Sequence, residues 1–197
     1  MIRQALVSIP VLFLFAWNSA FAAPTIGAKA PEFILPQASG AGNFDLAKSL
    51  KQNKLVVLMF IATKCPFSNA YNERMAKLPS LYQGKGVQFI GINSNHNEPN
   101  AEIIEHARTH GLTFPILKDE ANRIADLYDA KKTPEVFVID SQGILRYHGR
   151  IDENYQDAAG VTSPDLANAL GALLANKSVP AATTKAFGCS IKRVGAK

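Results

Sequence analysis

The hydrophobic and polar positions of the chain follow two different periods. Residues 55–62 (LVVLMFIA) form an unbroken apolar run with β-branched members, which predicts a strand buried on both of its faces. Segment 70–82 instead places its large apolar side chains at helical spacing, at Tyr71, Met75, Leu78 and Tyr82. Gly84 and Gly86 follow, which predicts that this helix ends before them.

The same two patterns alternate along the rest of the chain. Further strands are predicted at 87–93, 113–117, 134–140 and 144–150, and further helices at 99–110, 120–128 and 163–175. Ser163 and Pro164 open the last helix, as an N-cap followed by a proline in the first turn. Strands separated by helices, then a hairpin and a final helix, predict an α/β fold with a mixed central sheet flanked by helices.

The first 22 residues have the pattern of an export signal. Arg3 precedes an apolar run of 13 residues at 5–17, and alanines occupy positions 20 and 22 before Ala23. The run is short for a membrane span, which disfavours a retained anchor. We therefore expect residues 1–22 to be a signal peptide and the mature protein to be exported, to the periplasm or, alternatively, as a secreted protein.

Composition limits the remainder to one globular domain with a tail. The chain has 197 residues, 47% of them hydrophobic, which supports one compact core. The formal net charge of +5 is too small to favour a dedicated nucleic-acid binder. No acidic residue follows Asp165, so the excess positive charge belongs to the tail. The predicted organisation is a domain at 23–175 and a basic C-terminal tail at 176–197 that carries Cys189.

The sequence predicts that the thiol of Cys65 is the reactive group. The chain has two cysteines, too few for a disulfide-dense scaffold or a four-cysteine zinc site. Cys65 follows the predicted buried strand, and Pro66 is typical of a first helical turn. At a helix start, free backbone N–H groups and the positive end of the helix dipole favour a thiolate, and Lys64 adds positive charge. The thiolate is the nucleophile of disulfide exchange and of peroxide reduction.

A buried strand followed by Cys65-Pro66, with Thr133-Pro134 before a later strand, resembles the thioredoxin-fold redox proteins. The similarity spans about 27–175 and is closest to the redoxin group, which includes exported thioredoxin-like proteins and peroxiredoxins. The tail sequence GCSIK at 188–192 is similar to the ending of a subgroup of exported members. The resemblance implies a thioredoxin fold, a cis peptide bond at Pro134, and substrate binding by Thr133, Pro134, Pro66 and Ser68.

The chain also departs from both groups. Thioredoxin-like proteins carry a second cysteine where Ser68 stands and a tryptophan where Lys64 stands. Ser68 cannot resolve a mixed disulfide; it can donate a hydrogen bond to the Cys65 sulfur or simply supply helix-terminal polarity. Peroxiredoxins carry threonine or serine where Ala62 stands, which weakens a peroxidase assignment.

Cys189 is the candidate for the missing resolving thiol. It follows a flexible-looking segment, 176–188, that is long enough to fold back over the domain. We expect a reversible disulfide in which Cys65 attacks and Cys189 resolves. The alternatives are a permanent structural bridge, which would stabilise the fold by about 4–5 kcal/mol, and two cysteines that never meet. The basic charges around Cys189 either assist its chemistry or mark a solvated terminus.

The sequence therefore predicts an exported thiol-disulfide oxidoreductase that needs no cofactor and no metal. The alternatives are a thiol peroxidase with antioxidant activity, a copper-binding protein using Cys65 and a histidine, and a non-catalytic thioredoxin-fold protein. His106 and His110 are four residues apart on a predicted helix, where a solvated face is favoured over a metal site. Expected partners are protein thiols or disulfides or a peroxide, together with an external thiol reductant. The sequence leaves open the direction of the reaction, the substrate and the oligomeric state.

Overall fold

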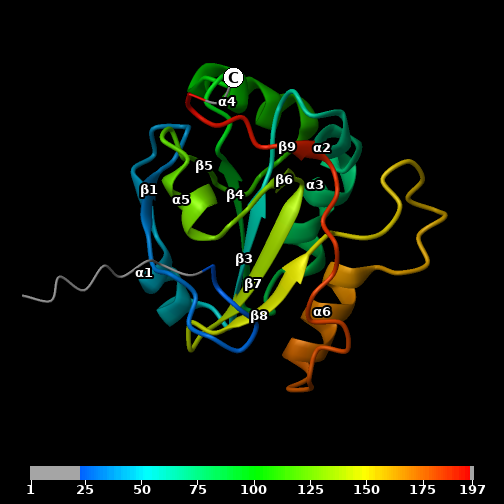
Figure 1. Ribbon diagram of the computed structural model, residues 1–197. Helices are drawn as coiled ribbons and strands as arrows, with labels where there is room; N and C mark the ends of the chain where they lie inside the picture. Colours follow the sequence, from blue (N-terminus) through cyan, green and yellow to red (C-terminus); the bar gives the residue numbers. More distant parts are fainter. Residues whose placement is uncertain (1–22, 196–197) are drawn as a thin grey trace, which may run out of the picture.

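The computed structural model describes residues 23–195. Segment 1–22, where the sequence predicts the export signal, lies outside the described residues. A five-stranded sheet occupies the centre, with strands in the spatial order β5-β4-β3-β7-β8 (Figure 1). These strands are β3 (Leu55–Phe60), β4 (Val87–Asn93), β5 (Ile116–Lys118), β7 (Glu135–Asp140) and β8 (Leu145–Gly149). Strands β3, β4 and β5 are parallel to one another, and β7 and β8 are antiparallel to their neighbours.

The described residues also form six helices and two short strand pairs. The helices are α1 (Leu46–Gln52), α2 (Pro66–Ala70), α3 (Asn72–Leu81), α4 (Asn100–His110), α5 (Arg123–Leu127) and α6 (Asp165–Leu174). The strand pairs are β1 (Ile34–Pro36) with β2 (Asn43–Asp45), and β6 (Lys132–Thr133) with β9 (Cys189–Ser190). The predicted α/β architecture with a mixed sheet is therefore confirmed.

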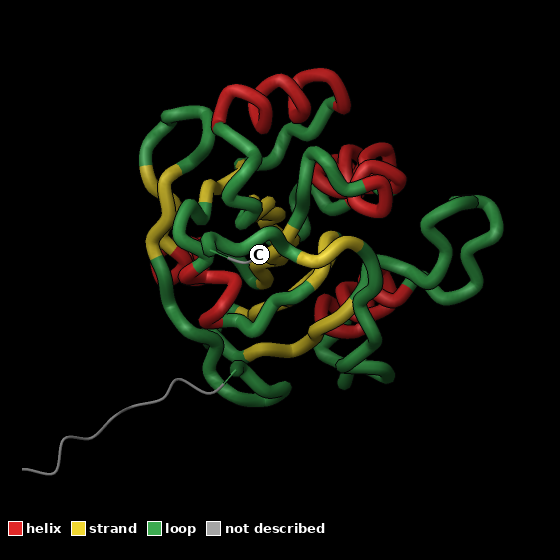
Figure 2. Tube along the Cα trace, turned by 45° about the horizontal axis from the view of Figure 1, so that its top comes forward, coloured by secondary structure: helices red, strands yellow, loops and turns green. Residues whose placement is uncertain are grey.

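The central strand β3 explains why the core has two layers. All six of its residues are buried, and successive side chains point to opposite faces of the sheet. Val56, Leu58 and Phe60 pack with α1 and α5, whereas Leu55, Val57 and Met59 pack with α3, α4 and α6. Figure 2 shows the helices on both sides of the strands. Because β3 is packed on both faces, its C-terminal end is held in place. The Cys65 loop starts from that end.

Several element boundaries differ from the sequence prediction; the strand predicted at 113–117, for example, is Ile116–Lys118 in the structure. The predicted helix 70–82 is divided at Tyr71, which separates α2 from α3. Helix α5 begins three residues later than predicted, because the Asp119 carboxylate accepts the backbone N–H groups of Ile124 and Ala125 and so fixes the first turn there. Ser163 is not an N-cap: its hydroxyl donates to the Asp165 carboxylate, and Pro164 occupies the cap position.

The largest difference concerns the tail. The composition of 176–188 is typical of a flexible segment, but in the structure the chain from Thr183 onward lies along the domain. Thr183 forms a bridge with His148 in β8, and Ile191 is buried in the core at 5% exposure. Figure 1 shows the tail, in red, running up from α6, past α2 and across the end of the sheet. The tail therefore reaches the end of the sheet at which β3 ends and the Cys65 loop begins.

Two glycine substitutions test the packing of the sheet and of α6. A β-carbon at Gly91 in β4 would lie 2.9 Å from Ile61 and 3.1 Å from Phe114, so Gly91→Ala should lower the free energy of unfolding by about 1–3 kcal/mol. Gly171 lies inside α6 with open space around its α-carbon. Gly171→Ala should therefore raise the free energy of unfolding by about 0.5–1 kcal/mol. Chemical denaturation of both variants measures the two changes, and equal effects at the two positions would contradict this packing.

Candidate active site at the end of strand β3

Cys65 occupies the N-cap position of α2, directly after the loop that leaves β3. Its sulfur accepts the backbone N–H of Ser68 at 3.4 Å, as a side-chain cap of the helix. Pro66 stands in the first turn, where a missing N–H costs nothing. Cys65 is only 3% exposed. The sequence prediction of a cysteine at a helix start is therefore confirmed, and the structure adds that this cysteine is buried.

The surroundings of Cys65 favour its thiolate. Burial by itself opposes ionisation, but four hydrogen bonds to the sulfur outweigh it and lower the pKa of Cys65 below its ordinary value. The backbone N–H of Ser68 donates to the sulfur at 3.4 Å, and the side chains of Cys189 and Thr133 and the backbone N–H of Cys189 lie where they stabilise the thiolate. The Thr133 hydroxyl is buried and lacks another partner among the described residues, so it is free to serve the sulfur once the thiol ionises.

Thr133 and Pro134 face this sulfur from a separate loop. The peptide bond between them is cis, as the sequence analysis expects. In the protonated state the Cys65 thiol donates to the Thr133 carbonyl oxygen at 3.2 Å. Thr133 also belongs to strand β6, where it is paired in antiparallel register with Cys189. The structure thus brings Cys65, Thr133, Pro134 and Cys189 together at one place.

Cys189 approaches Cys65 through the tail strand β9. Both cysteines are free thiols in the structure. Burial raises the pKa of Cys189 to about 11, helped by the hydrogen bond to Cys65 and by the negative charge that Cys65 acquires on ionising. The neighbouring Gly188 permits this approach, because a β-carbon there would lie 2.1 Å from the Thr133 carbonyl oxygen. The two thiols are therefore adjacent and differ in acidity, with Cys65 the more acidic one.

The loop before Cys65 is held by the buried carboxylate of Glu98. One carboxylate oxygen accepts the backbone N–H of Thr63 at 2.7 Å and the other that of Lys64 at 3.2 Å. The side-chain amides of Asn93 and Asn95 donate to the same carboxylate at 2.6 and 2.8 Å. Glu98 is fully buried. The sequence analysis missed this residue, because a single glutamate in a loop has no spacing that distinguishes it from a solvated charge.

The same network also reaches the tail. The Asn95 side-chain oxygen accepts the backbone N–H of Lys192 at 2.7 Å, and the Lys192 carbonyl oxygen accepts the N–H of His96 at 3.0 Å. Lys118, buried beneath this loop, donates to the carbonyl oxygens of Asn95 and Glu98. The loop 93–98 therefore joins the Cys65 loop to the segment that carries Cys189.

Two expectations about neighbours of Cys65 are wrong in detail. Lys64 does not direct its charge at the sulfur: its ammonium pairs with Glu102 at 2.9 Å and donates to the Asn97 carbonyl oxygen. The Ser68 hydroxyl accepts the backbone N–H of Ala62 at 3.1 Å, so Ser68 serves Cys65 through its backbone N–H instead. Both side chains stabilise the loop, because each ties α2 or its approach to a neighbouring segment.

The histidines contribute no metal site to this region. The rings of His106 and His110 are in contact, with centroids 4.4 Å apart and planes tilted by 48°, and His106 contacts the side-chain amide of Asn72. Burial, and secondarily the neighbouring His110, lowers the pKa of His106. The described residues 23–195 contain no group of three or more histidine, cysteine, aspartate or glutamate side chains placed to hold a metal ion. The copper-binding alternative therefore finds no ligand cluster in this part of the chain.

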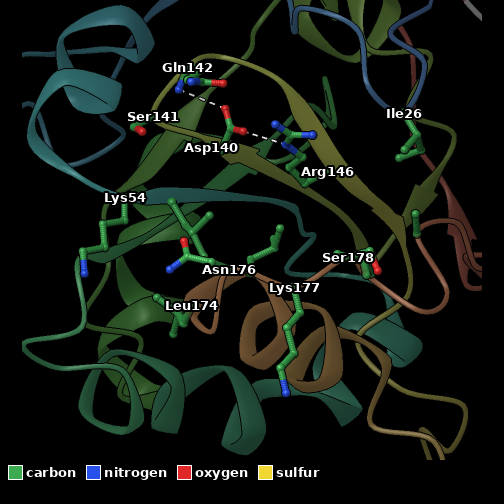
Figure 3. Close-up of a pocket in the computed structure, with 14 residues that line it drawn as sticks. Ile26, Lys54, Asp140, Ser141, Gln142, Arg146, Leu174, Asn176, Lys177 and Ser178 are labelled. Atoms are coloured by element: carbon green, nitrogen blue, oxygen red, sulfur yellow. Dashed lines mark hydrogen bonds and ion pairs between the residues drawn. The ribbon is translucent and has the colours of Figure 1, made fainter.

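One large pocket lies away from the thiols. Figure 3 shows this cavity of about 670 Å³, lined by Lys54, Asp140, Arg146, Asn176 and Lys177 among others. Lys54 immediately precedes β3, whereas Cys65 follows its far end. The cavity therefore lies near the N-terminal end of β3, whereas Cys65 lies beyond its C-terminal end.

Comparison with known proteins agrees with this site. The profile of the AhpC/TSA family matches residues 26–148, more than half of the sequence. The chain belongs to the AhpC/TSA family. It is 30% identical over 124 residues to the thiol-disulfide oxidoreductase ResA of Geobacillus kaustophilus, covering 63% of this chain and 68% of the relative. It is 28% identical over 130 residues to the thiol:disulfide interchange protein DsbE of Escherichia coli, covering 66% and 67%.

A solved structure extends the likeness beyond the family match. A hypothetical protein of Sinorhizobium meliloti has 32% sequence identity and a TM-score of 0.80, over 89% of this chain and 98% of that one. The predicted thioredoxin-like redoxin fold is thus confirmed, and the family member described here is an oxidoreductase, in a family that includes thiol-disulfide oxidoreductases and peroxiredoxins.

The difference in acidity between the two thiols is testable by titration. Thiolate absorbance near 240 nm should rise in two steps, one below pH 9 from Cys65 and one near pH 11 from Cys189. Cys65→Ser should remove the first step and move the second to lower pH, because the neighbouring negative charge is lost. A single step at the ordinary pH of an isolated cysteine would contradict the assignment.

The role of Glu98 predicts a pH-dependent stability. Burial opposes its ionisation, but the four donors outweigh this and hold the pKa of Glu98 below its ordinary value, so its contribution is present above about pH 4.5 and is lost as the pH falls through the lower folded-state pKa. Glu98→Gln turns an amide NH₂ toward backbone donors and should cost about 1–3 kcal/mol at pH 7. Denaturation curves at pH 7 and pH 3 should show this cost shrinking at the lower pH. An equal cost at both would contradict an ionised Glu98.

Proposed function

We propose that this protein is an exported thiol-disulfide oxidoreductase in which Cys65 is the nucleophile and Cys189 the resolving thiol. The observation that carries the proposal is the pairing of β9 with β6, which sets Cys189 opposite Thr133, the residue whose carbonyl oxygen accepts the Cys65 thiol at 3.2 Å. The fold otherwise supplies only Ser68 where a CxxC motif would supply its second cysteine. The tail provides that cysteine from the far end of the chain.

The proposed cycle transfers two electrons to a disulfide. The Cys65 thiolate attacks one sulfur of the substrate, the substrate S–S bond breaks, and one substrate thiolate leaves. Cys189 loses its proton and attacks the Cys65 sulfur of the mixed disulfide. The second substrate thiolate then leaves, and a Cys65–Cys189 disulfide remains. An external dithiol returns both cysteines to the reduced state and is itself oxidised to a disulfide.

Peroxide reduction is the second candidate, favoured by the AhpC/TSA family and by the burial of Cys65. Here the Cys65 thiolate attacks one peroxide oxygen, the O–O bond breaks, and hydroxide leaves as water after taking a proton. Cys189 then attacks the sulfenic acid, and a second water is released as the same disulfide forms. Both candidates therefore share one oxidised state, and the substrate distinguishes them.

The pairing of the thiols supports a reversible disulfide over a structural one. The tail is docked while both cysteines are reduced, so the bridge is not needed to hold it there. A thiol with a lowered pKa, such as Cys65, is a good leaving group when the bridge is reduced. A measured reduction potential far below about −300 mV would instead indicate a structural bridge.

Export to the periplasm, or secretion, rests on the pattern of residues 1–22. Within residues 23–195, no helix is long and apolar enough to span a membrane. Proposed partners are protein thiols or disulfides, or a peroxide, together with the external thiol reductant. The oxidising conditions outside the cytoplasm suit a thiol pair that cycles through a disulfide.

Replacing each cysteine tests the proposed roles. Cys65→Ala should abolish both insulin reduction and peroxide consumption, because the first attack is lost. Cys189→Ala should leave that first attack intact but trap Cys65 as a mixed disulfide or a sulfenic acid. Intact-mass spectrometry with and without reductant distinguishes these species and reports cleavage of the signal at the same time.

The wild-type chain provides the control. After oxidation its mass should fall by two hydrogen atoms, and a peptide linking Cys65 with Cys189 should appear only without reductant. Unchanged turnover of Cys189→Ala would refute the resolving role. Peroxide consumption without reduction of either insulin or a low-molecular-weight disulfide would select the peroxidase.

A further inference from the structure

The tail occupies the strand edge to which a polypeptide substrate would bind in a thioredoxin-like site. An extended peptide binds to a strand edge by main-chain hydrogen bonds, and this requires an unpaired edge. Beside Cys65 that edge is β6, and β9 already pairs with it in antiparallel register, Thr133 opposite Cys189 and Lys132 opposite Ser190. The tail therefore lies in the same position, relative to Cys65, that a second polypeptide would need.

An aromatic cluster fastens the tail directly to the active-site helix. Phe187 lies 6.3 Å from Phe67 and 6.0 Å from Tyr155, measured between ring centroids, and Phe67 lies 4.6 Å from Tyr155. Phe67 is part of α2, two residues after Cys65, and Phe187 is two residues before Cys189. This cluster therefore joins the tail to α2 close in sequence to both cysteines.

Further contacts anchor the tail on both sides of Cys189. Upstream, the backbone N–H of Thr184 donates to the His148 carbonyl oxygen at 3.0 Å. Downstream, Ile191 is buried, and the N–H groups of Lys192 and Val194 donate to the side chains of Asn95 and Asn122 at 2.7 and 2.8 Å. A partner would have to break contacts on both sides of Cys189 to expose Cys65.

We propose that the docked tail, residues 183–194, makes Cys65 selective by size: it admits hydrogen peroxide and low-molecular-weight disulfides and excludes polypeptide disulfides until the tail is displaced. The inference rests on the proposed role of Cys65 as nucleophile. Size selectivity by the tail is a separate property, which the proposed roles of Cys65 and Cys189 do not require. The 3% exposure of Cys65 and the occupied β6 edge both act against a bulky substrate.

The test compares two disulfides that undergo the same first step. In Cys189→Ser, the Cys65 thiolate attacks either hydroxyethyl disulfide or insulin, one S–S bond breaks, one thiolate leaves, and a single mixed disulfide accumulates. Mass spectrometry measures the rate at which the mixed disulfide forms with each substrate, and the rate with insulin is divided by the rate with hydroxyethyl disulfide. The same ratio is measured for glutathione, which is an unhindered thiol. The insulin to hydroxyethyl disulfide ratio should be at least tenfold lower for the protein than for glutathione.

Two variants in the same background displace the tail by different means. Phe187→Ala removes the aromatic contact, and Gly188→Val places side-chain atoms against the Thr133 carbonyl oxygen, where even a β-carbon would lie at 2.1 Å. Both should raise the insulin ratio at least tenfold, with faster amide hydrogen exchange at 187–192. Lys185→Ala is the matched control, because Lys185 is an exposed residue of the same tail, and it should leave the ratio unchanged.

The outcomes separate the two proposals. An insulin ratio equal to that of glutathione in Cys189→Ser, or a ratio that stays constant when hydrogen exchange shows a released tail, would overturn the size selectivity while leaving Cys65 as the nucleophile. Failure of Cys65 to react with either disulfide in every variant would instead overturn the proposed function itself.

Discussion

The site depends on one sulfur atom that receives hydrogen bonds from two distant parts of the chain. Ser68 N–H comes from the first turn of α2, and Cys189 contributes its thiol and its N–H from the tail. Without these donors, burial alone would raise the pKa of Cys65 and make the thiol inert. The Ser68 donor belongs to the helix itself, whereas the Cys189 donors act only while the tail is docked, so the acidity of Cys65 depends on the closed structure as well as on the helix.

Docking of the tail in turn depends on backbone contact that a side chain would prevent. Gly188 has φ +139°, in a region that favours glycine, and its α-carbon lies against the Thr133 carbonyl oxygen. Gly149 in β8 has the same role farther along, because a β-carbon there would lie 2.1 Å from the Thr184 hydroxyl oxygen. These two glycines let the tail lie close enough to β6 and β8 for main-chain pairing, which positions Cys189 without a covalent bond.

The sequence predicts the parts of this structure that local patterns encode. The apolar run of β3, the helical spacing of α3 and the cysteine at a helix start are local, and each is found where the pattern places it. The position of the tail could not be predicted in the same way, because the composition of 176–188 is compatible with both a flexible and a docked segment. The side chains that decide between them, Phe67 and Tyr155, lie far away in sequence. Glu98 was missed for a related reason, since its four donors come from separate loops.

Placing the second thiol on a tail, instead of on the next turn of α2, has a physical consequence. In a CxxC motif both sulfurs belong to one rigid helix start, so their separation is fixed. Here the separation depends on non-covalent contacts at β6, α2 and the loop 93–98, each of which contributes a modest free energy and can open locally. In the proposed cycle, access of a large substrate to Cys65 and attack by Cys189 need different positions of one segment: the tail opens for the substrate and closes for the disulfide to form. The equilibrium between these two positions, more than the intrinsic reactivity of either sulfur, is therefore what the sequence of the tail can tune.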